Sequence, residues 1–217
     1  MPDPGTLRLF LVRHGEVAAN RQLTFVGRGD DPLTQKGRRQ AAALGKTFRG
    51  IPVDRVVCSP LERCVATGRR IAVATGCAVV TDERIIEQSF GDWEGLTPAD
   101  IEKRGSGDGE RFRLWRQDPS GSPPGGESLL TVQRRATELV TDLVASGSAS
   151  TVLVSHVSPI KALVCHALGL PLTQVGRFFL DPASITVVDW SSSPVLRVMN
   201  AHAQMDWNQA GWLGERM

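Results

Sequence analysis

The sequence predicts an α/β protein: a three-layer α/β/α sandwich with a mainly parallel central sheet flanked by helices. Three observations favour this fold class. Short, nearly continuous apolar runs such as residues 7–12 (LRLFLV) are typical of strands buried on both faces. Segments of helical character alternate with these runs for most of the chain, as they do around a parallel sheet. The length of 217 residues and the lack of a long linker predict one domain over residues 1–217.

The first third of the chain alternates strand and helix. After the strand at residues 7–12, a polar, glycine-rich loop leads to Thr34, which suits the N-cap of the next helix. Residues 55–58 are predicted as the second strand. Ser59-Pro60-Leu61-Glu62 then combines an N-cap serine, Pro at N1 and Glu at N3, which predicts a helix that ends at Gly76.

The middle of the chain is less regular. Residues 78–81 are predicted as the third strand. Thr97 suits another helix start, and residues 118–126 (DPSGSPPGG) have the composition of a loop. Apolar residues then recur with the helical period from Val132 to Val144, which predicts the clearest helix of the chain.

The last third repeats the pattern and ends in a hairpin. Residues 151–155 are a buried strand, and Ser158-Pro159 after it predict a helix that ends at Gly169. Residues 184–190 and 195–200, joined by Ser-Ser-Ser-Pro, are predicted as the two strands of a hairpin.

Composition and charge exclude several function classes. The 25 Lys and Arg residues nearly balance the 23 Asp and Glu residues, and a net charge of +2 is too small for a sequence-independent nucleic-acid binder. The four cysteines form no C-x-x-C pair and no two histidines have metal-ligand spacing on one helix, so we expect no metal and no cofactor. No apolar run approaches about 18 residues and no signal-peptide pattern is found, so we expect no membrane partner and a cytoplasmic location.

Arginine and histidine side chains follow three of the predicted strands. Arg13 and His14 follow the first strand, Arg63 lies shortly after the second, and His156 directly follows the strand at 151–155. Ligands of open α/β sheets bind beyond the carboxyl ends of the strands, so these loops would meet in one crevice. Arginine forks match phosphate oxygens, and helix N-termini add backbone N–H groups. The pattern predicts a phosphate-binding crevice.

The same residues carry a resemblance to a known family. Leu11-Val12-Arg13-His14-Gly15-Glu16 resembles the signature of the histidine phosphatase superfamily, also called phosphoglycerate mutase-like, and the resemblance covers residues 9 to 202. Further segments match in the family's order. They are Asn20 with Asp30-Asp31-Pro32-Leu33-Thr34, Gly37 with Gln40-Ala41, Ser59-Pro60-Leu61 with Arg63 and Thr67, Glu87 with Phe90-Gly91 and Trp93-Glu94-Gly95, Gly126-Glu127-Ser128, and Val154-Ser155-His156.

The resemblance implies a phosphoglycerate mutase-like fold and a site with no metal. His14 would be the nucleophile and form a phosphohistidine. Glu87 would protonate the leaving oxygen and then activate water. His156 would help to hold the phosphoryl oxygens, whose charge is spread in the transition state. The other expected phosphate ligands are Arg13, Arg63, Asn20 and the backbone N–H of Val157.

Four other carboxylates compete with Glu87 for the role of acid. They are Glu16, Glu83, Glu94 and Glu127. Glu87 ranks first because of the resemblance, not because of its spacing. Glu94 is expected to be a structural hydrogen-bond partner, and Glu16 is expected to support the site from behind.

The predicted activity is that of a metal-independent phosphomonoesterase that acts on a small phosphate ester. The F-G-x-W-E-G segment is closer to the phosphatase branch than to the mutases, and His156–Lys161 is similar to the acid phosphatase and α-ribazole phosphatase members. Val157-Ser158-Pro159 departs from the usual Gly-Gly after the second histidine. A phosphoglycerate mutase and an inactive phospho-ligand-binding module are the alternatives. A homodimer is common in such families, and the tail 203–217, with Trp207 and Trp212, falls outside the match.

Overall fold

The computed structural model describes residues 6–105 and 107–203, and within them six strands form one sheet in the order β3-β2-β4-β1-β5-β6. The strands are β1 (Leu7–Arg13), β2 (Arg55–Cys58), β3 (Val79–Thr81), β4 (Ser150–Ser155), β5 (Ile185–Trp190) and β6 (Val195–Ala201). Strands β3, β2, β4 and β1 run parallel to one another, while β5 is antiparallel to both of its neighbours, β1 and β6. The predicted α/β class with a mainly parallel sheet is confirmed.

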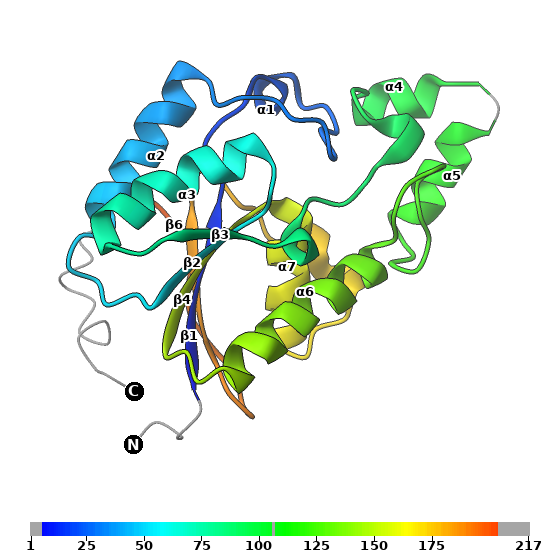
Figure 1. Cartoon of the computed structure of the whole chain (residues 1–217). Coiled ribbons are helices and arrows are strands. Elements are labelled where there is room, and N and C mark those ends of the chain that lie inside the picture. The colour runs from blue at the N-terminus through cyan, green and yellow to red at the C-terminus, as the bar shows by residue number, and fades with distance from the viewer. Residues whose placement is uncertain (1–5, 106, 204–217) are drawn as a thin grey trace.

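Helices cover both faces of this sheet (Figure 1). The α-helices are α1 (Ala18–Gln22), α2 (Gln35–Thr47), α3 (Glu62–Thr75), α4 (Pro98–Lys103), α5 (Asp108–Trp115), α6 (Leu129–Ala145) and α7 (Val157–Ala167), and the 3-10 turns are η1 (Glu83–Ile85), η2 (Gly91–Trp93) and η3 (Leu172–Arg177). Figure 1 shows α2 and α3 on one side of the sheet and α6 and α7 on the other. The architecture is therefore the expected three-layer sandwich.

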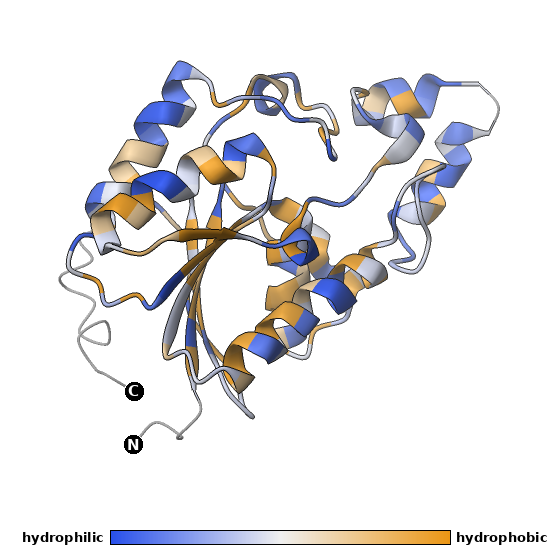
Figure 2. Cartoon of the chain, viewed as in Figure 1, coloured by the Kyte–Doolittle hydropathy of each residue, from blue (hydrophilic) through white to orange (hydrophobic). Residues whose placement is uncertain are grey.

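Strand β1 shows why the sheet needs both layers. Its seven residues are all buried. Leu9 packs into the core beneath α6 and α7, whereas Phe10 packs into the core beneath α2 and α3. Successive side chains of a strand point to opposite faces, so a nearly continuous apolar run is stable only between two apolar layers. Figure 2 shows the same pattern, with the most hydrophobic residues on the strands and on the helix faces turned toward them.

Two helix starts differ from the sequence prediction. Helix α3 begins at Glu62 with Leu61 as its N-cap residue, so Ser59 does not cap it. The Asp30 carboxylate instead accepts the Glu62 N–H at 2.7 Å. Helix α7 begins at Val157 with His156 as its N-cap residue, two residues before the start predicted with Pro159 at N1. In contrast, Thr34 accepts the Gly37 N–H and caps α2 as predicted.

The segment between η1 and α6 contains helical structure that the pattern of apolar residues in the sequence did not predict, above all α5. Helix α5 has no side-chain cap, and its residue Phe112 packs with Phe90, Trp93 and Ile101 in a separate aromatic cluster. This cluster lies apart from the main sheet, where α4 and α5 stand at the upper right of Figure 1. The predicted loop at 118–126 contains neither helix nor strand.

The ends of the described chain bear on two further predictions. Residues 204–217, nearly the whole of the tail discussed above, lie outside the described residues. Ala203, the first residue of that tail, accepts a hydrogen bond from the Thr47 hydroxyl of α2 at 3.1 Å. In the part of the chain that the structure describes, no helix combines the length and apolarity needed to cross a bilayer.

Candidate active site

A cavity of about 530 Å³ opens beyond the carboxyl ends of β1, β2 and β4. Because β4 lies between β1 and β2, the segments that follow these strands meet at one edge of the sheet. Six of the seven predicted site residues line this cavity: Arg13, His14, Asn20, Arg63, Glu87 and Val157. The seventh, His156, is fully buried beside them. Sequence positions spread over more than half of the chain thus converge as expected.

His14 is held as a neutral ring with a defined tautomer. Its Nδ1 lies 2.8 Å from the Gly15 carbonyl oxygen, which can only accept, so Nδ1 carries the proton. Nε2 then carries the lone pair. Burial, and next the charges of Arg13 and Arg63, hold the pKa of His14 well below its ordinary value. A neutral imidazole with a free Nε2 lone pair is the form that can attack phosphorus.

Gly15 is itself fixed by two close contacts. Its N–H donates to the Thr67 hydroxyl oxygen at 3.1 Å, and that hydroxyl donates to the Arg63 carbonyl at 2.7 Å. A Cβ on Gly15 would lie 2.6 Å from the Gly37 carbonyl oxygen, so only glycine permits this backbone approach to α2. The carbonyl that orients His14 therefore belongs to a tightly packed loop.

His156 packs against His14. The His14 and His156 ring centroids are 5.1 Å apart in an edge-on arrangement. Arg63 Nε donates to His156 Nδ1 at 3.3 Å, so His156 Nε2 carries the proton and donates to the Ser59 hydroxyl at 2.7 Å. Burial first, and then neighbouring His14 and Arg63, lower the pKa of His156 well below its ordinary value. The second histidine is neutral, and protein groups occupy both of its ring nitrogens.

Two buried arginines supply positive charge to the cavity. Arg63 also donates to the carbonyl oxygens of Gly27, at 2.8 Å, and Gly29. Arg13 donates to the Leu180 carbonyl at 2.5 Å, while its buried Nε has no hydrogen-bond partner among the described groups. Burial lowers the pKa of Arg13 to about 10, which still leaves the guanidinium charged at neutral pH. The cavity therefore has donors suited to a dianionic ligand.

The Glu87 carboxylate occupies the N-terminus of α7. One oxygen accepts from the N–H groups of Gln88, at 2.8 Å, and Ser158, at 3.2 Å, and the other accepts from the Val157 N–H at 3.2 Å. Helix N-termini favour anions, so this position suits a carboxylate. The Val157 N–H, expected to face a phosphoryl oxygen, here faces Glu87.

The rival carboxylates lie elsewhere. Hydrogen bonds from Arg21, Thr34 and Lys36 lower the pKa of Glu16 to about 2. Glu83 is exposed on η1. Glu94 accepts from the backbone N–H groups of Phe90 and Arg28, as expected of a structural partner. Glu127 pairs with arginines. Of the five, Glu87 alone lines the cavity within the described residues.

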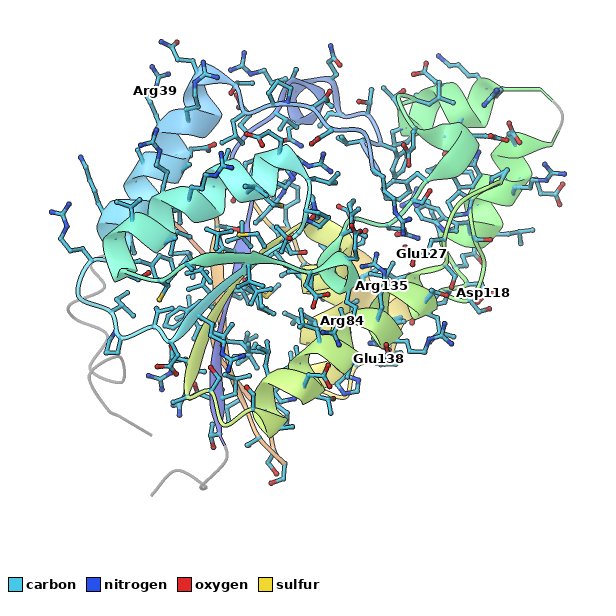
Figure 3. All side chains as sticks on the ribbon, in the orientation of Figure 1. Arg39, Arg84, Asp118, Glu127, Arg135 and Glu138 are labelled. Atoms are coloured by element: carbon cyan, nitrogen blue, oxygen red, sulfur yellow. The ribbon has the colours of Figure 1, made fainter. Side chains whose placement is uncertain are left out.

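Sequence reasoning gave no role to Lys161 and Arg135, two charged residues near the cavity. Lys161 lines it, and burial, followed by the charge of Arg13, lowers its pKa. Arg135 of α6 and Glu127 lie side by side in Figure 3 and form a salt bridge at 3.0 Å. The helical pattern of α6 places Arg135 beside its apolar stripe, which marks it as a surface residue. No local pattern indicates that it reaches the segment that carries Glu87.

The described residues include no group of three or more His, Cys, Asp or Glu side chains arranged to hold a metal ion. The cavity suits a phosphoryl group, since the guanidinium groups of Arg13 and Arg63 and the neutral His14 ring line it together with one carboxylate. His14, Arg63 and Glu87 come from separate segments of the chain, which the sheet brings together.

Comparisons with known proteins agree with this geometry. The model of the histidine phosphatase superfamily (branch 1) matches residues 9–202. A bifunctional protein of Mycobacterium tuberculosis is 40% identical over 185 residues, which cover 84% of this chain and 50% of that protein, so the chain spans about half the length of this curated relative. A probable phosphoglycerate mutase of Klebsiella pneumoniae is 32% identical over 210 residues, covering 96% of this chain and 91% of the relative. The solved structure of a mycobacterial glucosyl-3-phosphoglycerate phosphatase with VO3 has a TM-score of 0.80 and 33% identity, covering 89% of this chain and 99% of the other.

Proposed function

The chain belongs to the histidine phosphatase superfamily, and from that premise we propose that it is a metal-independent phosphomonoesterase that acts through a phosphohistidine on a small phosphate ester. The observation that carries the proposal is the state of His14. It is neutral, its Nδ1 is bound to the Gly15 carbonyl, and it lines a cavity together with Arg13, Arg63 and the carboxyl group of Glu87. The similarity to a glucosyl-3-phosphoglycerate phosphatase supports hydrolysis as the net reaction.

The proposed reaction has two steps. His14 Nε2 attacks phosphorus, so the P–N bond forms as the bond to the leaving oxygen breaks, and Glu87 in its acid form gives that oxygen a proton. In the second step, Glu87 takes a proton from water, the water oxygen attacks phosphorus and the P–N bond breaks. Inorganic phosphate leaves, and His14 is neutral again.

The remaining site residues stabilise charge in this proposal. Arg13 and Arg63 bind the equatorial oxygens, where charge is spread in the transition state. Asn20 and the Val157 N–H are proposed as further phosphate ligands, the latter once the Glu87 carboxyl group has turned toward the leaving oxygen. His156 backs the site by accepting from Arg63 and packing against His14.

The test is brief exposure to a phosphate ester labelled in the phosphoryl group, with EDTA present. We expect acid-labile label on the wild type and none on His14→Ala. His166→Ala is the matched control, since His166 stacks on Trp190, does not line this cavity and should keep the label. Label that is stable to acid but released by hydroxylamine would indicate an acyl phosphate and overturn the proposal.

A phosphoglycerate mutase is the second candidate, favoured by the relative of that name that matches nearly along its whole length. Such an enzyme would return the phosphoryl group to a substrate hydroxyl faster than to water. The same labelled protein, chased with either phosphoglycerate or buffer, separates the two activities. A cytoplasmic location and a homodimer stay predictions from the sequence.

A further inference from the structure

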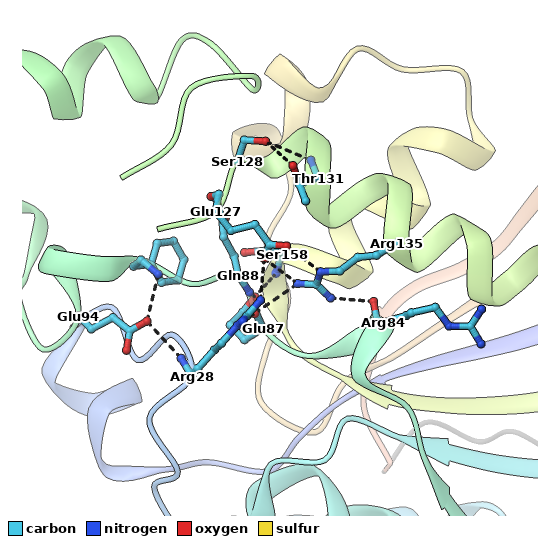
Figure 4. A network of polar contacts seen from close by, with 11 residues as sticks. Arg28, Arg84, Glu87, Gln88, Glu94, Glu127, Ser128, Thr131, Arg135 and Ser158 are labelled. Carbon is cyan, nitrogen blue, oxygen red and sulfur yellow. Dashed lines mark hydrogen bonds and ion pairs between the residues drawn. The ribbon is translucent and has the colours of Figure 1, made fainter. Parts of the chain in front are cut away.

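The segment that carries Glu87 has little regular structure of its own. Glu87 lies between the 3-10 turns η1 and η2, in neither a strand nor an α-helix. No sheet or helix hydrogen bonds fix its backbone, so its position depends on contacts from other parts of the chain. Side-chain donors supply these contacts (Figure 4).

Arg135 provides two of them. Its guanidinium donates to the Arg84 carbonyl at 2.7 Å and to the Glu87 carbonyl at 3.3 Å. It therefore binds the backbone both at Glu87 and three residues before it. Its other donors bind both carboxylate oxygens of Glu127 at 3.0 Å. Arg135 and Glu127 are 14% and 13% exposed, which keeps this two-pronged ion pair largely out of water.

Glu127 adds contacts to Arg28 and to the residues that follow Glu87. Its carboxylate also binds Arg28 at 3.3 Å, and Arg28 approaches the Glu87 carbonyl at 3.5 Å. The Glu127 carbonyl accepts from Gln88 Nε2 at 2.7 Å, and its N–H donates to the Ser89 carbonyl at 2.9 Å. The two residues that follow the acid are thus bound to Glu127, which lies just before α6.

We propose that Arg135 and Glu127 form a positioning pair for the acid: together they hold the Glu87 backbone so that its carboxyl group stays at the N-terminus of α7, within reach of the leaving oxygen. The pair does not touch substrate in this proposal. It acts through the carbonyl oxygens of Arg84 and Glu87. This inference rests on the proposed function, because it requires Glu87 to be the acid.

The dependence of the rate on the leaving group tests the proposal. A nitrophenolate leaves without a proton, whereas an alkoxide needs one, so a displaced acid should affect only the second kind of substrate. We compare kcat/KM for p-nitrophenyl phosphate and for glycerol 2-phosphate, because kcat/KM does not include the later hydrolysis of the phosphohistidine. Arg135→Lys keeps the charge but loses the planar fork. We expect kcat/KM to fall about tenfold or more for the alkyl ester and less than about twofold for the aryl ester.

Glu127→Gln provides a second variant in case Arg135→Lys folds poorly. It keeps the backbone contacts of residue 127 and loses the ion pair, so it should show the same selective loss. A control variant tests for general effects. Arg134→Lys changes the exposed neighbour of Arg135 on α6 and should alter neither rate.

Glu87→Gln separates failure of this inference from failure of the proposed function. If Glu87→Gln shows the selective loss but Arg135→Lys and Glu127→Gln slow both esters equally, the pair is only structural and the inference is overturned. If Glu87→Gln slows both esters equally, Glu87 is not the acid and the proposed mechanism fails with it. Selective loss in all three variants supports both.

Discussion

Replacing Thr67 with valine should weaken both the fold and the orientation of His14. The Thr67 side chain is fully buried, and its hydroxyl oxygen accepts the Gly15 N–H at 3.1 Å. Valine has the same shape but no acceptor, so the Gly15 N–H would be left buried without a partner. Such a group costs about 1–3 kcal/mol. For a chain of this size each kcal/mol lowers the melting temperature by about 2–4 °C, so we expect a loss of about 2–12 °C.

The expected effect on kcat/KM follows from the hydrogen bond between Gly15 and His14. The Gly15 carbonyl holds His14 Nδ1, so a loosened Gly15 should let the ring turn and lower kcat/KM about tenfold. Thr67→Ser keeps the hydroxyl and should keep kcat/KM. Thr151→Val is the matched control, since Thr151 is also fully buried but bonds to Ser148, away from the cavity. If Thr67→Val and Thr151→Val have equal melting temperatures and unchanged kcat/KM, the hydrogen bond does not orient His14.

Two predictions concern pH. Because its partners lower the pKa of Glu16 from 4.5 to about 2 in the folded chain, the carboxylate stabilises the fold above pH 4.5, and this contribution is lost as the pH falls toward 2. The melting temperature of Glu16→Gln should therefore lie below that of the wild type at pH 7 and approach it in acid; a constant difference would contradict the assignment. His14 should stay neutral well below its ordinary pKa of 6.5, so kcat/KM, corrected for ionisation of the substrate, should not decline with a midpoint near pH 6.5. A histidine of ordinary pKa would lose about 90% of its neutral form by about pH 5.5, and a decline of that kind would refute the burial argument.

Much of the fold and the centre of the site could be predicted, and the reason is geometric. Buried apolar runs identify parallel strands, and the carboxyl ends of such strands meet at one edge of a sheet. That rule alone predicts that Arg13, His14 and His156 lie together, since Arg13 ends β1 and the two histidines directly follow β1 and β4. The assignment of Glu87 came from the resemblance to a family. Its neighbours in sequence contain no pattern that distinguishes it from the other carboxylates.

What could not be predicted depends on contacts between distant parts of the chain. Ser59 has the sequence features of a helix cap, but its hydroxyl binds His156, and Asp30 binds the first N–H of α3 instead. Helix α5 lacks a cap and is stabilised by an aromatic cluster that forms only in the folded chain. Arg135 resembles any polar residue beside the apolar stripe of a helix.

The position of β4 has a consequence for how the protein forms. β4 separates β1 from β2, so the first three strands cannot make one continuous sheet by themselves. During synthesis, the site around His14 at the end of β1 cannot be completed until residues 150–155 emerge and insert between strands made much earlier. Contacts of such long sequence separation are slow to form. A chain stopped before β4 would contain Arg13, His14, Arg63 and Glu87, yet it would lack the strand that brings them together. We therefore expect phosphate binding only from a chain in which the sheet is complete.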